Sequence, residues 1–364
     1  MSWSLYPVAQ FAAHADEWRR LHASSGGHAL LAFDFVNPLL TEFAGGDELL
    51  ACHETGGQIT AMAVLVRSGR ASWSTFQPAQ APIGVWLQLP GQPMAQLLGA
   101  LVKRLPGLAL VCAVTQCDPL LAPRPRDSNH VRAIDYIDTA RITLAGGFDA
   151  YWQGRGKNLR ANLKKQRARL AKEGVQARIE VSRGPADVAT AVADFGRLEG
   201  AGWKARAGTA VNIDNAQGRY YRAMLEAFCA RGAGSIYRYW FDGQLVAMDL
   251  CVEDGDSIVV LKTAYDESVP SHYSPTLLMR EEACRQLFDE GRFARIEFYG
   301  KVMEWHLRWT DEIRTLYHMN YYRWPALVFL HTLLHTSLHT LLRRAPSAGP
   351  APTPSAPDGA TRVH

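Results

Sequence analysis

The sequence predicts an α/β fold arranged as two lobes, each with a mixed central sheet flanked by helices. Runs rich in β-branched and aromatic residues alternate with helical patterns along most of the 364 residues, and this alternation is typical of sheets covered by helices. A chain of this length usually forms about two domains. The Asp242-Gly243 pair between two apolar runs further predicts a β-hairpin with a tight turn.

The first lobe is predicted to span residues 1–140. Helical patterns occupy about 8–21 and 93–104, and Gly-Gly and Pro-Gly pairs separate short apolar runs. The expected strands, between residues 30 and 114, are LLAFDF, ELLACHE, ITAMAVLVR, ASWSTF, GVWLQL and LALVCAV. We interpret the following loop, LAPRPRDSNH, as the boundary segment because it is rich in proline and arginine.

The second lobe is predicted to span residues 141–324 and to repeat this alternation. Its expected elements after a basic helix are the strand ARIEVS, a helix at about 185–198, the helix GRYYRAMLEAFCARG, the strands GSIYRYWFDG, QLVAMDLCVED and SIVVLKTAYD, a helix from Pro275 and the strand FARIEFYG. The two halves share this rhythm of elements without an exact internal repeat.

The basic helix that opens the second lobe has one apolar stripe on an otherwise cationic surface. Residues 151–173 carry eight Lys or Arg residues against one acid, Glu173, and Gly174 predicts the end of the helix. The stripe, at helical period, consists of Trp152, Leu159, Leu163 and Leu170.

This helix has two readings. One is a solvated face, which is what charge runs usually are. The other is a surface for a phosphorylated cofactor, an acyl carrier protein or tRNA, with Arg160 and Lys164 as contact residues. The formal net charge of the chain is only +4, so an anionic partner has to be met by such a local patch. The helix lacks the interleaved aromatic residues of single-strand binders, which argues against nucleic acids other than tRNA.

A strand, turn, helix and strand unit follows near the centre of the second lobe. Ser274 fits an N-cap and Pro275 the first helical position, and the helix is expected to stop at Gly291. In the next strand, RIEFYG, alternation places Ile296 and Phe298 on one side and Glu297 and Tyr299 on the other.

Such a unit presents the positive end of a helix at the carboxyl edge of a strand, where an anionic group is readily held. We therefore place the ligand there. The residues expected to bind an anionic donor are Lys262, Asp266, Ser274 and Thr276. Because strand, turn and helix occur together in most α/β proteins, plain architecture is the alternative reading.

Several separated motifs between about Phe148 and Arg323 agree with one known family. The strings NLRANLKKQRARL, LEGAGWKARAGTAV, RYYRAML, DGQLVAMDL, LKTAYDESVPSHYSPTLLMRE and EFYGKVMEWHLRWT resemble the CelD-type acyltransferase domain of cellulose and exopolysaccharide loci. That domain belongs to the GNAT superfamily and lies close to the FemABX peptidyltransferases. The first half resembles the degenerate first lobe of the same proteins.

The resemblance implies tandem GNAT-like lobes, with acyl transfer to an amine or hydroxyl in the second. Acyl-CoA or an acyl carrier protein would then be a co-substrate rather than a tightly bound cofactor. The Gln/Arg-x-x-Gly-x-Gly/Ala pyrophosphate loop is absent, and Ser274-Pro275-Thr276 stands in its place. Because fewer glycines leave less room for amides around a pyrophosphate, CoA, carrier protein and aminoacyl-tRNA all remain open as donors.

Direct acyl transfer needs a base, an oxyanion donor and an acid for the leaving group. Asp249, in the apolar run AMDLCV, and Glu297 are the candidate bases, because desolvation raises a carboxyl pKa. Tyr265 and Tyr299 are the candidate acids. The alternatives are an outward-facing strand residue for Asp249, an ion pair with Arg295 for Glu297 and tyrosines at a core edge. No Gly-x-Ser-x-Gly elbow supports a nucleophilic hydrolase.

Two segments are expected to bind the acceptor, a small metabolite or a sugar or lipid precursor. The first is the Gly-rich loop LEGAGWKARAG and the second is the segment YGKVMEWHLRW, for which a packed amphipathic helix is the alternative. The contact residues predicted in them are Glu199, Trp203, Lys204, Lys301 and Trp305.

Residues 325–344 are predicted to form an amphipathic helix that carries three histidines on one face, and 345–364 a disordered tail. Without a carboxylate nearby, the histidines are a weak metal signal, so no metal is expected. The helix suits docking on the body of the protein, on a partner or on a membrane surface. The N-terminus lacks a secretory signal pattern, so we expect a cytoplasmic protein with peripheral membrane contact as an option.

Three functions therefore stay open: a GNAT-like acyltransferase, a FemABX-like transferase that uses aminoacyl-tRNA, and a binding module without catalysis.

Overall fold

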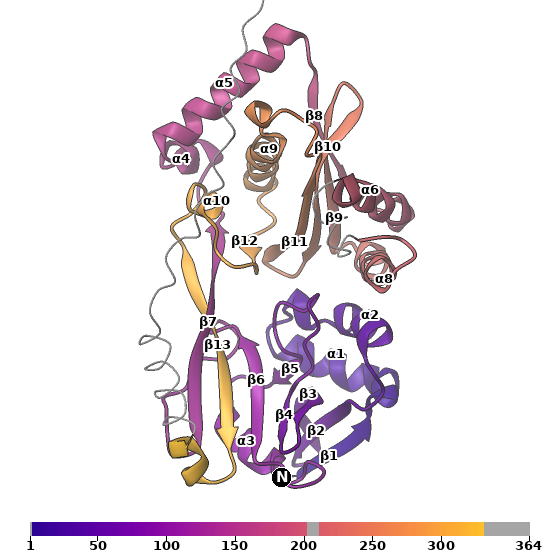
Figure 1. The fold of residues 1–364 in the computed structure, drawn as a ribbon, viewed down its shortest axis with the longest axis vertical. Coiled ribbons are helices and arrows are strands. Elements are labelled where there is room, and N and C mark those ends of the chain that lie inside the picture. The colour runs from indigo at the N-terminus through magenta and orange to yellow at the C-terminus, as the bar shows by residue number, and fades with distance from the viewer. Residues whose placement is uncertain (1, 202–210, 331–364) are drawn as a thin grey trace, which may run out of the picture.

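The computed structural model describes residues 2–201 and 211–330. They form two lobes that share one continuous sheet (Figure 1). The predictions for 331–344 and for the tail at 345–364 lie outside the described residues. Among the described residues, the helices are too short or too polar to cross a membrane.

The first lobe contains mostly antiparallel strands covered by short helices. Its strands are β1 (Ser2–Pro7), β2 (Leu49–Thr55), β3 (Gln58–Gly69), β4 (Ser72–Thr75), β5 (Trp86–Gln88) and β6 (Val111–Cys117). Its helices are η1 (Val8–His14), α1 (Ala15–Ser24), η2 (Ala29–Leu31), α2 (Phe33–Phe43) and α3 (Met94–Leu101). The predicted strand LLAFDF is wrong, because this run ends η2 and starts α2. The helical spacing of the buried Phe35, Val36, Leu39 and Leu40 extends beyond the short apolar run that suggested a strand.

The second lobe contains the expected helices and strands. Its helices are α4 (Phe148–Gln153), α5 (Lys157–Glu173), η3 (Pro185–Asp187), α6 (Val188–Ala201), α8 (Ala216–Ala230), η4 (Ser271–Tyr273), α9 (Pro275–Glu290) and α10 (Glu304–Leu307). Its strands are β8 (Ala177–Ser182), β9 (Gly234–Phe241), β10 (Gln244–Glu253), β11 (Ser257–Tyr265) and β12 (Arg295–Phe298). Asp242 and Gly243 both have positive φ, at 46° and 87°, which confirms the tight hairpin turn between β9 and β10.

Two long strands join the lobes. The strand β7 (Val131–Thr143) pairs with β12 of the second lobe, and the strand β13 (Ile313–Tyr322), from the end of the described chain, lies between β6 and β7. Figure 1 shows β7 and β13 running side by side from one lobe to the other. The range 141–324 thus includes a strand that completes the sheet of the first lobe.

The strand order reveals a repeat that the sequence does not display. The order is β1-β2-β3-β4-β6-β13-β7-β12-β11-β10-β9-β8. From the β1 edge, four antiparallel strands are followed by β6, which runs parallel to β4, and then by the antiparallel β13. From the β8 edge, four antiparallel strands are followed by β12, which runs parallel to β11, and then by the antiparallel β7. The predicted fold class, two α/β lobes each built on a mixed sheet with flanking helices, is confirmed.

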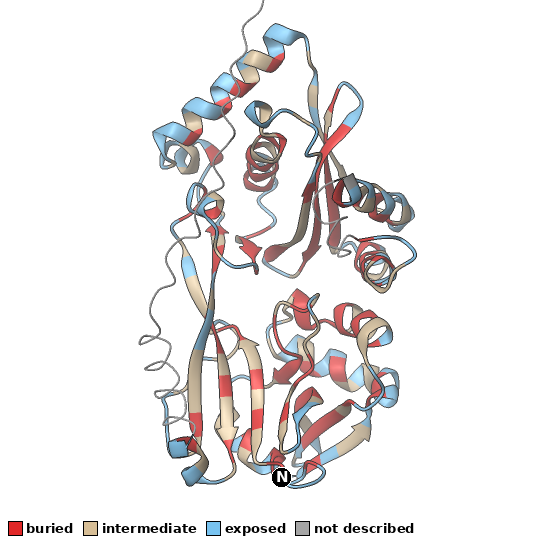
Figure 2. Cartoon of the chain, viewed as in Figure 1, coloured by how far each residue is buried: buried red, intermediate tan, exposed pale blue. Residues whose placement is uncertain are grey.

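Helices cover both faces of the second-lobe sheet (Figure 1). The helices α5 and α9 share a core with Ile296 and Phe298 on one face, and α6 and α8 share another with Ile236 and Leu250 on the opposite face. Buried residues follow the strands and the inner sides of these helices, whereas much of α5 is exposed (Figure 2). The lobes also meet where α2 packs on α8, with Arg231 bound to Asp34 at 2.9 Å.

The joining strand β13 should be essential to stability, because it fills the position between β6 and β7. Leu316 in β13 is fully buried, and Leu316→Ala is expected to lower the free energy of unfolding by about 2–5 kcal/mol. Ile313→Ala, at an exposed position of the same strand, is the control and should cost less than about 1 kcal/mol. Urea unfolding followed by circular dichroism measures both, and equal losses would contradict this role of the strand.

Candidate functional site

The strands β11 and β12 run parallel but separate after a short paired region. Their register extends from Ser257 opposite Arg295 to Val260 opposite Phe298, where β12 ends while β11 continues to Tyr265. At the same level, the pairing of β10 with β11 skips Leu261. Such a bulge leaves the backbone groups of the extra residue outside the ladder. The sheet therefore opens next to unpaired backbone groups.

A pocket of about 900 Å³ lies beside this opening, and we call it the β11 pocket. The end of β11, the following loop, the first turns of α9 and the α10 segment line it. It brings together five of the residues singled out from the sequence, namely Tyr265, Asp266, Ser274, Thr276 and Trp305. The predicted location of a ligand beside Ser274 therefore coincides with a cavity.

The first turn of α9 offers few free amides to that pocket. Ser274 has a left-handed backbone, with φ 41°, and its hydroxyl donates to the Ser271 carbonyl instead of capping the helix. It is the N-cap in position, but the expected side-chain cap is wrong. Pro275 has no N–H, and the Leu277 and Leu278 amides donate to the Ser274 carbonyl. Among the described residues, the Thr276 amide is left without a partner in this turn.

Asp249 forms a buried ion pair at the wall of the β11 pocket. Its carboxylate is 2.8 Å from the guanidinium of Arg280 in α9 and accepts a hydrogen bond from the Thr263 hydroxyl. Both charged residues are almost fully buried, and Arg280 lines the pocket. Asp249 thus holds the guanidinium of Arg280 in place, and the positive charge of Arg280 compensates the negative charge of Asp249.

Glu297 and Tyr299 lie on the opposite face of the sheet from α9, as the alternation in RIEFYG predicts. Ile296 and Phe298 pack with α9, whereas Glu297 and Tyr299 line a second cavity of about 800 Å³ between the lobes. We call this cavity the inter-lobe pocket. The two pockets lie at opposite ends of β11, since one contains Tyr265 and the other contains Ser257.

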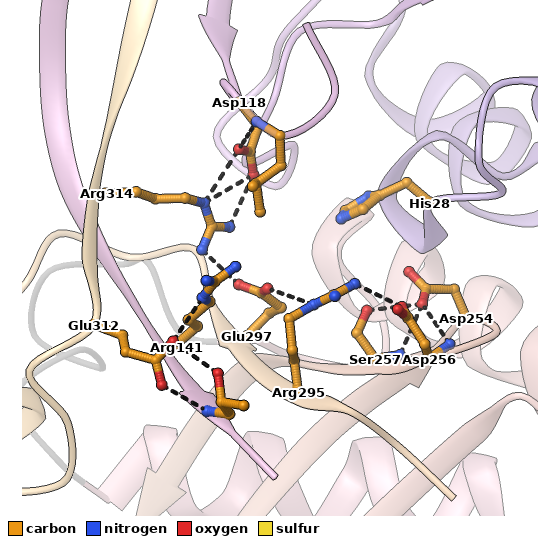
Figure 3. Close-up of polar contacts among 12 residues, drawn as sticks. His28, Asp118, Arg141, Asp254, Asp256, Ser257, Arg295, Glu297, Glu312 and Arg314 are labelled. Atoms are coloured by element: carbon orange, nitrogen blue, oxygen red, sulfur yellow. Dashed lines mark hydrogen bonds and ion pairs between the residues drawn. The ribbon is translucent and has the colours of Figure 1, made fainter. Parts of the chain in front are cut away.

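Glu297 is a buried member of a chain of charges that runs from the buried Asp118 to the exposed Asp256 (Figure 3). Its Oε2 accepts from Arg314 at 2.7 Å, and the same guanidinium binds Asp118 of the first lobe at 2.8 Å. Its Oε1 lies 3.4 Å from Nε of Arg295, which in turn binds Asp256 at 2.6 Å. Burial raises the pKa of Glu297 even though Arg314 opposes this shift. The expected pairing with Arg295 is present, but the closer partner is Arg314.

Tyr299 connects the lobes through two hydrogen bonds. Its hydroxyl donates to Asp118 at 2.7 Å and lies 2.8 Å from Nε2 of His28. Because the hydroxyl proton points to Asp118, Nε2 must be the donor, while Nδ1 accepts from the Leu30 amide. Burial lowers the pKa of His28 and raises the pKa of Tyr299. Both side chains are therefore neutral near pH 7.

Lys262 and Glu199 lie on the face covered by α6 and α8. The Lys262 ammonium is 3.3 Å from Glu199 and lies over the ring of Tyr221 at 5.2 Å. This position is on the opposite face from Ser274. Trp203 and Lys204, which follow Glu199 in the chain, lie outside the described residues.

The basic helix α5 is partly anchored and partly free. Arg160 donates to Gln153 at 2.8 Å, and Arg167 binds Glu281 and Glu282 of α9, both at 2.8 Å. Among the described residues, no ion pair is formed by the exposed Lys157, Lys164, Lys165 and Lys172. Neither Arg160 nor Lys164 lines the two pockets. Lys301 is exposed between β12 and α10.

Sequence reasoning missed residues from both pockets. Arg280, Arg308 and Trp309 line the β11 pocket; the last two belong to the EWHLRWT string, so their position beside Trp305 was a usable signal. Local sequence gives no such signal for His28 and Asp118, because they come from the first lobe. No group of three potential metal ligands occurs within 2–201 and 211–330.

The Asp249–Arg280 pair gives a direct test of the pocket wall. Arg280→Met should lower the free energy of unfolding by about 3–5 kcal/mol, because it leaves the Asp249 charge buried without a partner. The control is Arg308→Met, which removes an arginine whose side chain is 45% exposed and should change stability by less than about 1 kcal/mol. Urea unfolding compares them. A neutral effect of Arg280→Met would contradict the buried pair, and Asp249→Asn added to it should restore part of the loss.

Comparison with solved structures shows that this fold is shared. The C-terminal domain of a putative lysylphosphatidylglycerol synthetase from Agrobacterium fabrum matches 90% of this chain and 97% of its own, with TM-score 0.53 and 13% identity. FemX matches 94% and 100%, with TM-score 0.53 and 10% identity. A conserved protein of unknown function from Bacteroides thetaiotaomicron matches 85% and 97%, with TM-score 0.53 and 12% identity. At such identities the likeness concerns the fold alone.

In sequence, the family described as acetyltransferase (GNAT) domain matches residues 157–307, from the start of α5 to the end of α10. No curated protein matches the chain. The matched segment includes the parted strands and most of the β11 pocket, which confirms the resemblance to the GNAT superfamily for the second lobe. Residues 157–307 are therefore similar to the acetyltransferase (GNAT) domain family, within a chain whose fold is shared with the three structures above.

Proposed function

We propose that this chain is an acyltransferase that moves an acyl group from a thioester, carried by CoA or by an acyl carrier protein, to an amine or hydroxyl of a small metabolite or of a polysaccharide or lipid precursor. The observation that supports this most is the parting of β11 from β12, with the β11 pocket at one end and Glu297 on the opposite face of the sheet. A thioester placed in the opening would be contacted by residues of the β11 pocket on one side and by Glu297 on the other.

The donor would enter from the β11 pocket. The free Thr276 amide and the Arg280 guanidinium provide hydrogen-bond donors there, and Trp305 and Trp309 provide apolar walls. The unpaired backbone at Leu261 is in the right place to bind the carbonyl oxygen as it becomes an oxyanion.

Glu297 is the base in this proposal, because it is buried beside the opening and its pKa is raised. It takes a proton from the acceptor amine or hydroxyl, whose lone pair attacks the thioester carbonyl carbon. The carbon–sulfur bond then breaks, and the thiolate leaves with a proton from Tyr265, which lines the β11 pocket. Asp249 and Tyr299 transfer no proton in this proposal. Asp249 positions Arg280, and Tyr299 holds the two lobes together through His28 and Asp118. Lys262 and Glu199 would line the acceptor approach.

A FemABX-like transferase that takes its acyl group from aminoacyl-tRNA is the second candidate. Two observations favour a donor whose charges lie outside the pocket. The first turn of α9 leaves only one amide free among the described residues, and Asp266 and Glu267 line the same cavity. The exposed lysines of α5 are available for such a macromolecule. The CelD type, a cytoplasmic location and peripheral membrane contact remain proposals beside either candidate.

A donor panel tests the proposal. Labelled acyl-CoAs, acyl carrier proteins and aminoacyl-tRNAs are each incubated with the full chain and a pool of amines and sugars, and labelled product is measured. Thr276→Trp fills the mouth of the β11 pocket and should reduce transfer by about tenfold or more, equivalent to ~1.4 kcal/mol of donor binding. Thr41→Trp, at an exposed site on α2, should have no effect.

The panel also separates the two candidates. Transfer from thioesters with little dependence on salt supports the first. Transfer from aminoacyl-tRNA that weakens steeply with salt supports the second, because phosphate contacts release counterions. No turnover with any donor contradicts both.

Glu297→Gln tests the base. The rate of transfer should fall by about 10²–10⁴, because the acceptor loses its proton acceptor. In the unchanged protein the rate should rise with pH through the pKa of Glu297, above the ordinary glutamate range, since only the ionised form accepts a proton. Glu304→Gln, which alters an exposed carboxylate, is the control. Full activity of Glu297→Gln, with its fold verified by circular dichroism, would exclude this role.

A further inference from the structure

The solvent side of α5 carries lysines and alanines in a regular pattern. The helix lies at the outside of the second lobe (Figure 1), and much of its surface is exposed (Figure 2). Four residues exceed one helical turn by about 40°, so residues at this interval lie side by side in neighbouring rows. Two sets of exposed residues repeat the order Lys, Ala, Lys at this interval, and we call them the α5 face: Lys157, Ala161 and Lys165, then Lys164, Ala168 and Lys172.

The α5 face thus consists of a row of alanines between two rows of lysines. Among the described residues, none of its four lysines forms an ion pair, and no acidic residue stands between Lys157 and Lys172 in the sequence. Arg167, by contrast, lies outside the rows and is bound to acids of α9. The face therefore presents four uncompensated positive charges along ~22 Å of helix, at about 1.5 Å per residue.

The alanine row limits the kind of partner that fits. Ala161 and Ala168 carry only a methyl group each, so the backbone of α5 can be approached closely between the two lysine rows. Helices pack with their axes about 8–10 Å apart, and the shorter distances need small residues at the contact. A partner helix that lies along the alanine row can place acidic side chains beside both lysine rows. Phosphate groups are bound best by arginine, which is missing from the rows.

A groove leads from the end of α5 to the β11 pocket. It has a volume of about 320 Å³, and Leu170 of α5 is part of its wall. Val269 and Pro270 line both this groove and the β11 pocket. Tyr273, which also lines the groove, donates a hydrogen bond to Glu173 at the end of α5. A protein held on the α5 face is therefore close to a path into the proposed donor site.

We propose that the α5 face docks an acidic helix of an acyl carrier protein, whose thioester arm then enters the β11 pocket along the groove. This inference rests on the proposed function, which left CoA and carrier protein open as donors. Complementary charges favour the encounter and set its register. The single free amide in the first turn of α9 agrees with such a donor, because the pyrophosphate of CoA needs several amides, whereas a carrier protein is held largely outside the pocket.

Binding is tested without turnover, by fluorescence anisotropy of a labelled holo acyl carrier protein added to the full chain. Lys164→Glu combined with Lys165→Glu reverses one charge in each lysine row. This pair should weaken binding of the carrier protein by about tenfold or more, a difference of ~1.4 kcal/mol. Arg70→Glu combined with Lys103→Glu, at exposed positions of the first lobe, is the matched control and should leave the affinity unchanged.

A second pair of changes tests the alanine row without altering any charge. Ala161→Gln combined with Ala168→Gln keeps residues that favour a helix but fills the space between the lysine rows. Binding of the carrier protein should again weaken by about tenfold, whereas labelled tRNA, which is attracted by charge, should bind as before. Ala23→Gln combined with Ala223→Gln, at exposed positions of α1 and α8, is the control and should change neither affinity.

Four results would overturn the proposal. They are no binding of the carrier protein, undiminished binding to the Ala161→Gln and Ala168→Gln variant, an equal loss for carrier protein and tRNA in that variant, and tighter binding of tRNA than of the carrier protein to the unchanged chain. The last result would assign the α5 face to the aminoacyl-tRNA of the second candidate.

The outcome is separable from that of the proposed function. If the carrier protein binds as described but no thioester yields product, the acyltransferase proposal fails and the docking site stands. If hexanoyl-CoA and the hexanoyl carrier protein are equally good donors, and Lys164→Glu with Lys165→Glu affects neither, the docking site fails and the acyltransferase proposal stands.

Discussion

The pairing of β7 with β13 is the constraint on which the rest of the structure depends. These antiparallel strands join two halves of the sheet, and in each half the six strands along the main path have the same pattern of antiparallel and parallel pairing. Because β13 comes from the end of the described chain yet lies beside β6, it carries Arg314 to the junction of the lobes. There the guanidinium binds Asp118 of one lobe and Glu297 of the other. Strand exchange thus builds the charged site.

Each lobe contains a pair of parallel strands that could part, but only in the second lobe does the parting lead to a cavity. In the first lobe, β4 and β6 also run parallel and would part after Ser74 and Ala113. That gap is closed, because the Thr75 and Thr115 hydroxyls lie 2.7 Å apart and the Gly84 amide donates to the Thr115 carbonyl. A Cβ at Gly84 would lie 2.3 Å from Thr75 Oγ1, so only glycine allows this close approach. The equivalent opening in the second lobe leads to a cavity.

Local signals in the sequence were sufficient for the second lobe and insufficient for the junction. The turn at Asp242-Gly243 and the alternation in RIEFYG depend on neighbouring residues, and the structure agrees with both. The strands β7 and β13 have no clear alternation, because each lies between two other strands and carries charged residues whose partners lie elsewhere, as Arg314 binds Asp118 and Glu297. His28 and Asp118 approach Tyr299 only through the pairing of β7 with β13. Such contacts depend on topology, which short sequence patterns do not encode.

The position of Glu297 connects these points. It pairs in register with Val259, one residue before β11 and β12 part, and its side chain points away from α9 toward the first lobe. A base on the α9 side would compete with a donor for the same space. Because Glu297 is buried on the other face, the carboxylate in the proposed reaction acts on an acceptor that does not enter the β11 pocket. The second lobe supplies the opening, and the exchanged strand β13 and the first lobe complete the environment of Glu297 through Arg314 and Asp118.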